Sequence, residues 1–281
     1  MTEIHTLGLI AGEGQFPFLV AKAARSQKIP IVAFAIKGVT PPALEQYAEK
    51  TFWLELGQFD TMVGLFHEHQ LSHVVMAGRV PHAALFQNIQ FDERSKRILM
   101  ALQDKKANSI LGVITAELER EKIQVLDSSL FLKPCMPAAG LLTPERQLTP
   151  DEEKDVQFGL PIARDVARLD IGQTIVVKNQ IVVAVEGIEG TDKTIERGGE
   201  LGGLGTVVIK VSKPQQDLRF DIPTVGLSTI EYMEKAGASA LAISAGETLF
   251  FDRDESLALA KRANIAIVAI ESPSANSHPP Q

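Results

Sequence analysis

Short apolar runs alternate with stretches of helical periodicity through the first half of the chain. The runs predict buried strands at 6–11, 31–36, 52–54, 73–77 and 124–127. Between them, apolar residues recur at helical spacing and predict helices at 16–27, 43–48, 60–69, 92–102 and 109–122. Strands that alternate with helices are typical of a parallel sheet covered on both faces. We therefore predict an α/β fold that begins with a Rossmann-like parallel-sheet domain over residues 1–133.

The second half begins after 134–150, a stretch in which several prolines interrupt any regular pattern and predict a linker. Two strands, 174–178 and 181–185, are expected to form a hairpin with its turn at Asn179-Gln180. Further helices are predicted at 151–169, 194–201, 228–236 and 254–263, and further strands at 206–211, 240–244, 248–251 and 265–270. This pattern predicts a smaller C-terminal catalytic domain of mixed α/β fold over 151–271 and a disordered tail over 272–281.

The composition argues against a nucleic-acid-binding, a disulfide-linked or a membrane-spanning protein. A net charge of −7 and a pI near 5.5 argue against a general nucleic-acid binder, which would carry a basic stripe. Cys135 is the only cysteine, so an internal disulfide is excluded and a reducing compartment is favoured. No apolar run approaches the roughly 20 residues that a membrane-spanning helix needs. We expect a soluble, cytoplasmic protein.

The stretch 186–199, EGIEGTDKTIERGG, carries the densest set of candidate chemical groups. An extended run passes there into a helix start through a loop of glycines and acids. Backbone N–H groups at a helix start can bind an anion, and carboxylates beside an anion suggest a bridging Mg²⁺. The alternative is a capped helix start in which Thr191 or Asp192 is the N-cap.

A glycine turn follows the first predicted strand and invites a dinucleotide-binding interpretation. Gly12 and Gly14 begin a G-x-G-x-x-G pattern, but no third glycine follows. The acid expected after the second strand is also missing, because Lys37 stands there. A sugar or phosphate contact at this turn stays open, beside a purely structural role.

Charged side chains at the ends of predicted strands are further candidates for binding a phosphate or a metal ion. Arg79 follows the fourth strand and could clamp a phosphate, or could form a surface salt bridge. Lys210 and Lys213 leave one strand and can neutralise phosphate oxygens, while Asp192 and Asp221 can hold Mg²⁺ or orient water. Together these groups favour phosphoryl transfer, although each taken alone is more typical of a solvated ion pair.

Several long sequence blocks carry a resemblance that no single motif would establish. They are GLIAGEGQFP at 8–17, VMAGRV at 75–80, LDIGQ at 169–173, VEGIEGTD at 185–192 and KPQQDLRFDIPTVG at 213–226. In this order they resemble the UDP-2,3-diacylglucosamine pyrophosphatase family of the lipid A pathway that lacks the calcineurin-like metallophosphatase fold. The resemblance runs from about residue 7 to residue 270.

The resemblance implies a Mg²⁺-dependent hydrolase that splits UDP-2,3-diacylglucosamine into UMP and 2,3-diacylglucosamine 1-phosphate. It also implies two domains around a lipid-linked UDP-sugar substrate and a homodimer that exchanges domains. The family's catalytic aspartate corresponds to Asp221. The expected metal ligands are Asp221 and Asp192, with Glu189 as the alternative to Asp192. The expected substrate-binding residues are Gly12, Gly14, Gly78, Arg79, Glu189, Gly190, Thr191, Asp192, Lys210, Lys213 and Thr224.

Two positions depart from the family pattern. Asn108 stands where a further aspartate is expected, and His82 stands where many relatives carry another basic residue. The acyl chains of the substrate need an apolar cleft, and the candidates, each also compatible with core packing, are Phe16, Phe18, Leu85 and Phe86. A diacylated substrate also leads us to expect transient contact with the inner membrane surface.

Two other classes of function stay open at this point. A nicotinamide-dependent oxidoreductase would use the Rossmann-like domain, but the incomplete glycine fingerprint speaks against it. A non-catalytic nucleotide-sugar binding protein would use the acidic loops for binding alone.

Overall fold

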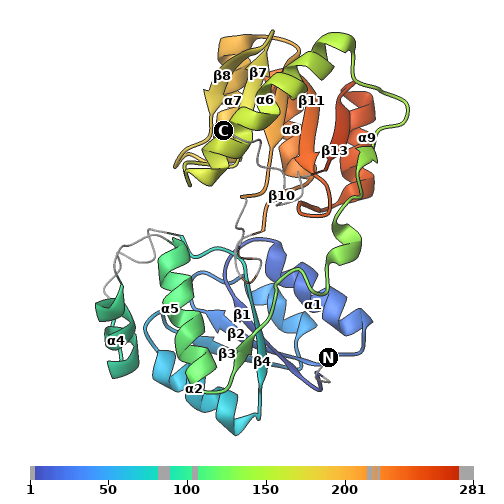
Figure 1. Ribbon diagram of the computed structural model, residues 1–281. Coiled ribbons are helices and arrows are strands. Elements are labelled where there is room, and N and C mark those ends of the chain that lie inside the picture. The colour runs from blue at the N-terminus through green and yellow to red at the C-terminus, as the bar shows by residue number, and fades with distance from the viewer. Residues whose placement is uncertain are drawn as a thin grey trace, which may run out of the picture. The chain divides into compact units, whose positions relative to one another are not determined.

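The computed structural model describes residues 4–81, 89–102, 107–213, 217, 219 and 222–271. Unit 1 comprises the residues up to Leu132 together with Asp217 and Arg219, and unit 2 comprises the other described residues from Lys133 onward. Figure 1 labels many of their helices and strands. The predicted tail 272–281 lies outside the described residues.

Unit 1 is built on a five-stranded parallel sheet with the strand order β3-β2-β1-β4-β5. The strands are β1 (Leu7–Ala11), β2 (Ile31–Ile36), β3 (Lys50–Leu54), β4 (His73–Ala77) and β5 (Gln124–Val125). From β1, the chain adds β2 and β3 on one side of the sheet and then β4 and β5 on the other side, so the order reverses between β1 and β4. In doubly wound sheets, ligands bind at the carboxyl ends of the strands at such a reversal.

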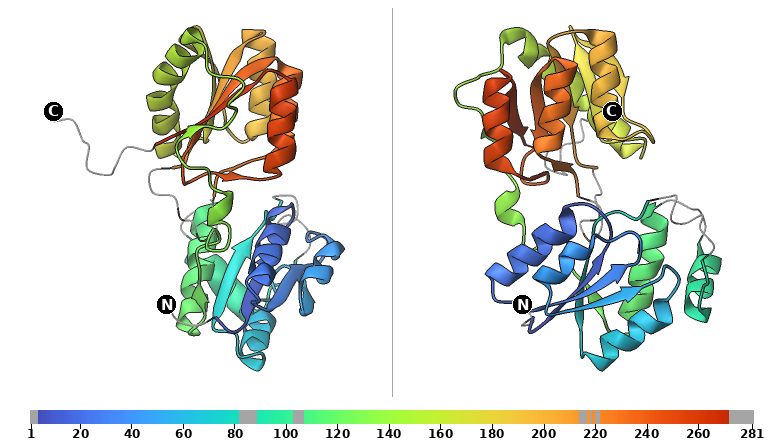
Figure 2. Two further views of the ribbon diagram at one scale, coloured as in Figure 1. Left: turned by 90° about the vertical axis from the view of Figure 1, so that its right-hand side faces the viewer. Right: turned by 180° about the vertical axis from the view of Figure 1, so that it is seen from behind.

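Helices cover both faces of this sheet, as Figure 2 shows. They are α1 (Phe16–Ser26), the 3-10 helix η1 (Pro42–Tyr47), α2 (Phe59–Glu68), α4 (Glu93–Ala101) and α5 (Ala107–Arg120). Val32 and Phe34 of β2 pack in one core with Phe66 of α2. The intervening Ala33 and Ala35 are also buried and point to the other face, because side chains alternate along a strand. Burial on both faces explains why these strands are continuous apolar runs.

Unit 2 is a six-stranded mixed sheet with the order β6-β13-β11-β9-β7-β8. Its strands are β6 (Gly140–Leu141), β7 (Thr174–Lys178), β8 (Ile181–Val185), β9 (Thr206–Lys210), β11 (Ala238–Ser244) and β13 (Ala266–Ile270). A separate pair of short strands, β10 (Thr224–Val225) and β12 (Leu249–Phe250), runs parallel. Strand β6 lies within the stretch predicted as a linker and pairs with β13.

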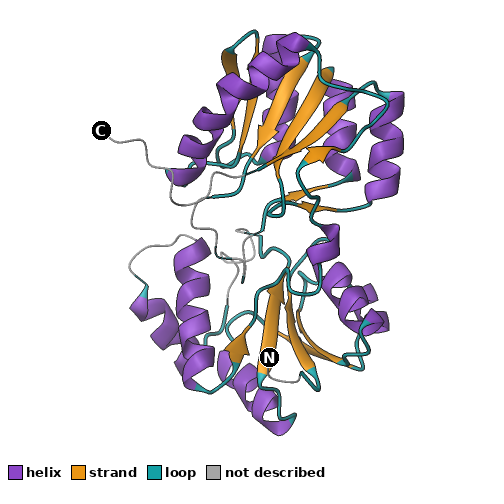
Figure 3. Ribbon diagram, turned by 45° about the vertical axis from the view of Figure 1, so that its right-hand side comes forward, coloured by secondary structure: helices purple, strands orange, loops and turns teal. Residues whose placement is uncertain are grey.

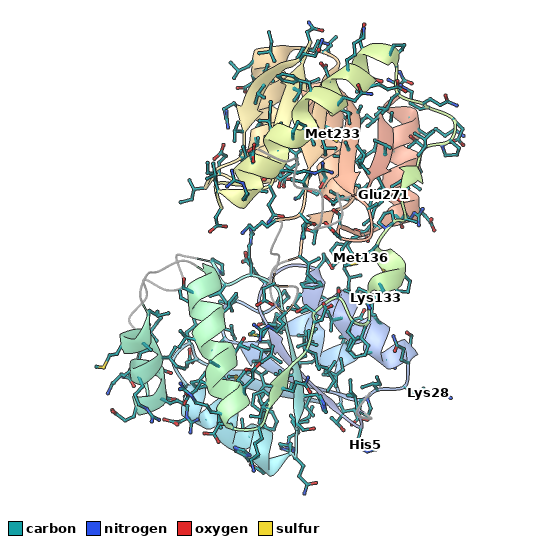
Figure 4. The ribbon with its side chains drawn as sticks, viewed as in Figure 1. His5, Lys28, Lys133, Met136, Met233 and Glu271 are labelled. Carbon is teal, nitrogen blue, oxygen red and sulfur yellow. The ribbon has the colours of Figure 1, made fainter. Side chains whose placement is uncertain are left out.

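Figure 3 shows helices on both sides of the unit 2 sheet. The helices are α6 (Pro150–Arg168), α7 (Thr191–Gly202), α8 (Leu227–Ala236) and α9 (Arg253–Arg262), and a 3-10 helix, η2, spans Lys133–Cys135. Met233, labelled in Figure 4, is fully buried in the core under α7, α8 and α9. Val156 of α6 packs in a second core on the opposite face.

The α/β fold class predicted from the sequence is confirmed for both units. Three local differences have physical causes. The helix predicted at 43–48 is the 3-10 helix η1, which begins at a proline. The strands β6 and β10 were not predicted, because two residues are too few to show the alternation of apolar and polar side chains. The helix start predicted at Thr191 or Asp192 is capped instead by Gly190, as described below.

The predicted β7–β8 hairpin is confirmed, and its turn is hydrogen-bonded to a side chain of α6. Asn179 and Gln180 form its turn with positive φ angles of 50° and 59°. The buried Asp155 of α6 accepts hydrogen bonds from both of their backbone N–H groups, at 3.0 and 2.5 Å. This contact replaces the water that the two turn amides would otherwise bind. None of the helices in the described ranges is long and apolar enough to cross a membrane.

The approach of α7 to β7 yields a first prediction. A Cβ atom added at Gly198 would lie 2.6–2.7 Å from three side-chain carbons of Val176. We expect Gly198→Ala to destabilise the protein by about 1–3 kcal/mol, although alanine favours a helix, because β7 leaves no room for the methyl group. Calorimetric unfolding measures this change.

Gly64→Ala is the matched control. Gly64 is an exposed position of α2 where a Cβ atom would meet nothing within 4 Å. Alanine there is expected to stabilise by about 0.5–1 kcal/mol. A Gly198→Ala variant as stable as the natural protein would contradict the close packing of α7.

Candidate functional site

In unit 1, the loops that follow β1 and β4 are joined by backbone hydrogen bonds. Gly12 N–H donates to the carbonyl of Ala77 at 2.8 Å, and Glu13 and Arg79 exchange backbone hydrogen bonds of 2.8 and 3.1 Å. A Cβ atom on Gly12 would lie 2.4 Å from the Arg79 carbonyl oxygen. One on Gly78 would lie 2.7 Å from the Glu13 carbonyl oxygen. Close backbone packing is therefore sufficient reason for glycine at both predicted site positions.

Arg79, predicted as a phosphate clamp or a salt-bridge partner, lies where these loops join and has an exposed side chain. Its Nη2 and Nε atoms lie 2.9 and 3.2 Å from one carboxylate oxygen of Glu13. Gly14, the remaining predicted position here, is exposed, and a Cβ atom there would meet nothing within 4 Å. The side of this turn that faces solvent is therefore open beside the start of α1.

In unit 2, the predicted residues gather at one edge of the sheet. Strand β7 runs antiparallel to β9, with Thr174 opposite Lys210, and β8 runs antiparallel to β7. The start of β7 and the ends of β8 and β9 therefore share this edge. We call it the β9 edge and define it by three loop segments, 169–173, 186–190 and 211–213.

A buried lysine joins these elements. Lys210 at the end of β9 is buried, and its Nζ donates to the Thr191 hydroxyl at 2.9 Å. The Thr191 hydroxyl donates to Glu186 Oε1 at 3.0 Å and lies 3.3 Å from the Thr174 hydroxyl. The other oxygen of Glu186 accepts the Gln173 N–H at 3.1 Å. The Thr191 hydroxyl can thus donate one bond and accept two, which is its full capacity.

We call the hydrogen bonds from Lys210 to Thr191 and from Thr191 to Glu186 the relay. The relay fixes the start of α7. Gly190 is the N-cap, with φ 82° and no side chain to close the helix end, and Thr191 is the first helical residue. The sequence-based assignment of Thr191 or Asp192 as N-cap is therefore wrong, because the chain needs a positive φ one residue earlier. The Thr191 hydroxyl is left to bind Lys210 and Glu186, and Asp192 lies in the first turn.

Glu189 is held within its own loop. Its Oε1 accepts a hydrogen bond from Arg197 Nη2 at 2.5 Å, and its Oε2 accepts the Gly187 N–H at 3.1 Å. The backbone N–H of Glu189 itself, followed by the Arg197 guanidinium, holds the pKa of the Glu189 carboxyl below its ordinary value of 4.5. Arg197 also donates to the Val185 carbonyl at 2.8 Å, so it ties this loop to the end of β8.

Lys213, the last predicted cation, joins two neighbouring loops of the β9 edge, 211–213 and 169–173. Its Nζ lies 2.7 Å from Asp170 Oδ1. Asp170 has a positive φ of 57° in the turn that follows α6. Thr224, predicted to bind substrate, lies in the short strand β10 and pairs with Leu249 of β12. The described contacts of Thr224 do not join it to the relay.

The predicted catalytic residue, Asp221, lies outside the described residues. The nearest described residue before it, Arg219, belongs to unit 1 and pairs with Asp217 at 2.7 Å and with Glu119 of α5 at 3.2 Å. Ser128 lies within hydrogen-bonding distance of the Arg219 carbonyl. The Arg219 guanidinium lowers the pKa of the Asp217 carboxyl. Asp217 and Arg219 are thus held within unit 1.

Asp192, one of the expected metal ligands, lies in the first turn of α7. Both oxygens of Glu186 and of Glu189 accept hydrogen bonds within the protein. Carboxylates are the ligands that Mg²⁺ prefers, which is the chemical basis for expecting Asp192 as a ligand. Within the described ranges, no three His, Cys, Asp or Glu side chains come together as a metal centre.

Other sequence-based candidates have separate environments. The Phe18 ring packs edge-on against Tyr47, with ring centroids 5.8 Å apart, which is ordinary core packing. Burial raises the pKa of the Cys135 thiol, which disfavours the reactive thiolate. His82, Leu85 and Phe86 lie outside the described residues, and the side chain of Asn108 is likewise not described.

Sequence reasoning did not assign roles to several residues that organise the β9 edge. They are Asp170, Gln173, Thr174 and Arg197, and Glu186 was expected only as one of the acids beside a bridging Mg²⁺ and not as the partner of Thr191. Thr174 stands opposite Lys210 only because β7 and β9 are neighbours, which local periodicity does not reveal. Glu186 had a signal, since it opens the acidic loop directly after a predicted strand.

Profiles of two domains match the chain along most of its length. The LpxI N-terminal domain matches residues 6–135, and the LpxI C-terminal domain matches residues 138–268. A protein of Caulobacter vibrioides (strain ATCC 19089 / CIP 103742 / CB 15), named UDP-2,3-diacylglucosamine pyrophosphatase LpxI, is 27% identical over 280 residues. The match covers 95% of this chain and 98% of that relative.

Similarities to solved structures are weak. Leucoanthocyanidin reductase with NADPH from Vitis vinifera is 12% identical over 95% of this chain and 78% of that chain, with a TM-score of 0.31. The biotin carboxylase domain of Hydrogenobacter thermophilus 2-oxoglutarate carboxylase is 13% identical over 62% of this chain, with a TM-score of 0.24. The match spans only 35% of that carboxylase chain. Neither score supports a conclusion about fold or function.

The relay yields a second prediction. Thr191→Val keeps the shape of the side chain but removes the hydroxyl shared by Lys210 and Glu186. We expect a loss of about 1–3 kcal/mol in the free energy of unfolding, because buried polar groups lose a partner. Thr191→Ser keeps the hydroxyl and should recover most of this stability. Urea unfolding measures both variants, and a valine variant as stable as the serine variant would contradict the relay.

A third prediction concerns the titration of Glu189. Its lowered pKa means that the contacts of its carboxylate are present above pH 4.5 and are lost as pH falls through the lowered pKa. Arg197→Met should raise this pKa toward 4.5, whereas Lys193→Met, which removes a partner of Glu196, should leave it unchanged. Carbon NMR of the Glu189 carboxyl against pH measures the midpoint. An unchanged midpoint in the Arg197 variant would contradict the assigned cause.

Proposed function

The chain belongs to the LpxI family, and on that premise we propose that it hydrolyses the pyrophosphate bond of UDP-2,3-diacylglucosamine, a step of lipid A biosynthesis. The products are UMP and 2,3-diacylglucosamine 1-phosphate. The main support is a relative named for this activity, whose alignment with this chain covers nearly the full length of both proteins. The charge pattern of the β9 edge supports the same reaction.

The β9 edge supplies groups suited to a diphosphate. The N-terminus of α7 presents backbone N–H groups beside Gly190, and Lys213 lies on the neighbouring loop. Lys210 contacts Thr191, since its side chain is buried and its ammonium donates to that hydroxyl. We therefore assign Lys210 to positioning the start of α7, and Lys213 to offsetting charge on a phosphate.

Asp221 is proposed as the catalytic carboxylate, with a role in orienting the attacking water. Its support is the sequence block at 213–226 and the anchoring of Arg219 two residues earlier. In unit 1, the open turn at Gly14 and the exposed Arg79 are proposed to contact the substrate. The Glu13 carboxylate orients the Arg79 guanidinium for that contact.

We propose Mg²⁺ as the cofactor, with Asp192 and Asp221 as its protein ligands. Bound there, the cation would neutralise diphosphate charge and lower the pKa of a water molecule. We also propose a homodimer that exchanges domains and a cytoplasmic protein that touches the inner membrane surface to reach its lipid substrate. The family resemblance is the support for these points.

The fourth prediction tests the activity directly. The purified protein with Mg²⁺ should release UMP from UDP-2,3-diacylglucosamine, and Asp221→Asn should lower kcat by about 10²–10⁴-fold because a carboxylate is lost from the reacting centre. Asp165→Asn is the control, since Asp165 is exposed on α6 and pairs with Arg168. EDTA should abolish turnover, and added Mg²⁺ should restore it. Chromatography of released UMP measures each reaction.

Circular dichroism of the Asp221 variant separates lost chemistry from lost folding. An active and folded Asp221→Asn protein would remove Asp221 from the mechanism. Full activity in EDTA would exclude the metal. No UMP release by the natural protein with any divalent cation would refute the proposed function.

A further inference from the structure

Three large apolar side chains at the β9 edge are exposed to solvent. Leu169 is 61% exposed, Ile171 is 52% exposed and Ile188 is fully exposed. Single exposed apolar residues are common on protein surfaces. These three, however, lie on only two loops of the same sheet edge, and such grouping is typical of an interaction surface.

The two loops are in direct contact. A Cβ atom added at Gly172 would lie 2.2 Å from the Glu186 carbonyl oxygen, and the Gln173 N–H donates to the Glu186 carboxylate. Ile171 directly precedes this contact and Ile188 follows it by two residues. The exposed side chains therefore flank one point at which the loops touch.

The same loops carry the ionic groups of the proposed diphosphate site. Asp170, between Leu169 and Ile171, binds Lys213 at 2.7 Å. Ile188 lies three residues before Thr191, the acceptor of the Lys210 ammonium. Apolar surface thus borders cations and a helix N-terminus, which matches a ligand that is anionic at one end and apolar at the other.

We propose that Leu169, Ile171 and Ile188 contact an acyl chain of the lipid-linked substrate. This inference rests on the proposed function and adds to it the surface that recognises the lipid part. Phe18 was a sequence-based candidate for this role, but its ring is engaged by Tyr47.

Position and size favour an acyl chain over other occupants. The three side chains border the groups proposed to bind the diphosphate, so the apolar part of the same substrate would lie beside them. A stable protein interface buries roughly 800 Å² on each partner, far more than three side chains provide. A single hydrocarbon chain needs only a few apolar contacts of this kind.

The test compares two triple variants, each with three exposed apolar residues changed to serine. The first is Leu169→Ser/Ile171→Ser/Ile188→Ser. The control is Ile181→Ser/Leu201→Ser/Leu204→Ser, whose positions are similarly exposed but lie at the other end of β8 and α7. KM and kcat are measured with UDP-2,3-diacylglucosamine carrying long or short acyl chains, dispersed in detergent.

The first variant should raise KM for the long-chain substrate about tenfold, which corresponds to about 1.4 kcal/mol of lost apolar contact. Its kcat should be nearly unchanged, because these contacts are the same in the ground state and the transition state. KM for the short-chain substrate, and both constants of the control variant, should stay at the natural values. Should the triple variant fail to fold, Ile188→Ser alone, at a fully exposed position, should still raise KM for the long-chain substrate.

Other results would overturn the inference. An unchanged KM, or equal effects on long-chain and short-chain substrates, removes these side chains from acyl recognition. A defect that appears only with substrate in phosphatidylethanolamine–phosphatidylglycerol vesicles assigns them to the membrane instead. A change in molar mass by light scattering assigns them to a second copy of the chain. If the natural protein releases no UMP from any substrate, the proposed function itself fails, and this inference fails with it.

Discussion

The burial of the Lys210 ammonium is the constraint on which the proposed site in unit 2 depends. A buried charge is costly unless protein groups replace its lost water. The Thr191 hydroxyl is one such group, and it is itself held by Glu186 and Thr174. The end of β9, the start of β7 and the start of α7 are thereby connected through one hydroxyl. The Lys210 ammonium therefore helps to fix the start of the helix that is proposed to bind a phosphate.

In unit 1 the candidate site residues are held together by the backbone and not by side chains. There the backbone itself forms the junction, since Gly12 and Gly78 let the ends of β1 and β4 cross at a distance that no side chain would allow. The junction is made by backbone groups, and the ion pair beside it joins the exposed Arg79 to the half-buried Glu13. Surface pairs of this kind contribute little to stability, which leaves the guanidinium available to exchange partners.

Local sequence patterns predicted most of the architecture because buried strands and amphipathic helices impose a period on the chain. The hairpin at Asn179-Gln180 and the order of elements in both units follow from such patterns. The cap of α7 could not be read in the same way, because the positive φ of Gly190 is a property of the folded loop. Contacts that depend on strand order, such as Lys210 with Thr191, and contacts across a hundred positions, such as Arg219 with Glu119, carry no local signal. The role of Asp221 remains a prediction from the family resemblance.

The excursion of the chain at Asp217 and Arg219 has a consequence for how the protein can be divided. Unit 2 continues on both sides of this segment, yet the segment itself is bound by Glu119 and Ser128 of unit 1. A cut near residue 132 would therefore not yield two complete modules, because the first fragment would lack a strip of its own surface. A chimaera that replaced unit 1 alone would have to keep the partners of Arg219 at Glu119 and Ser128.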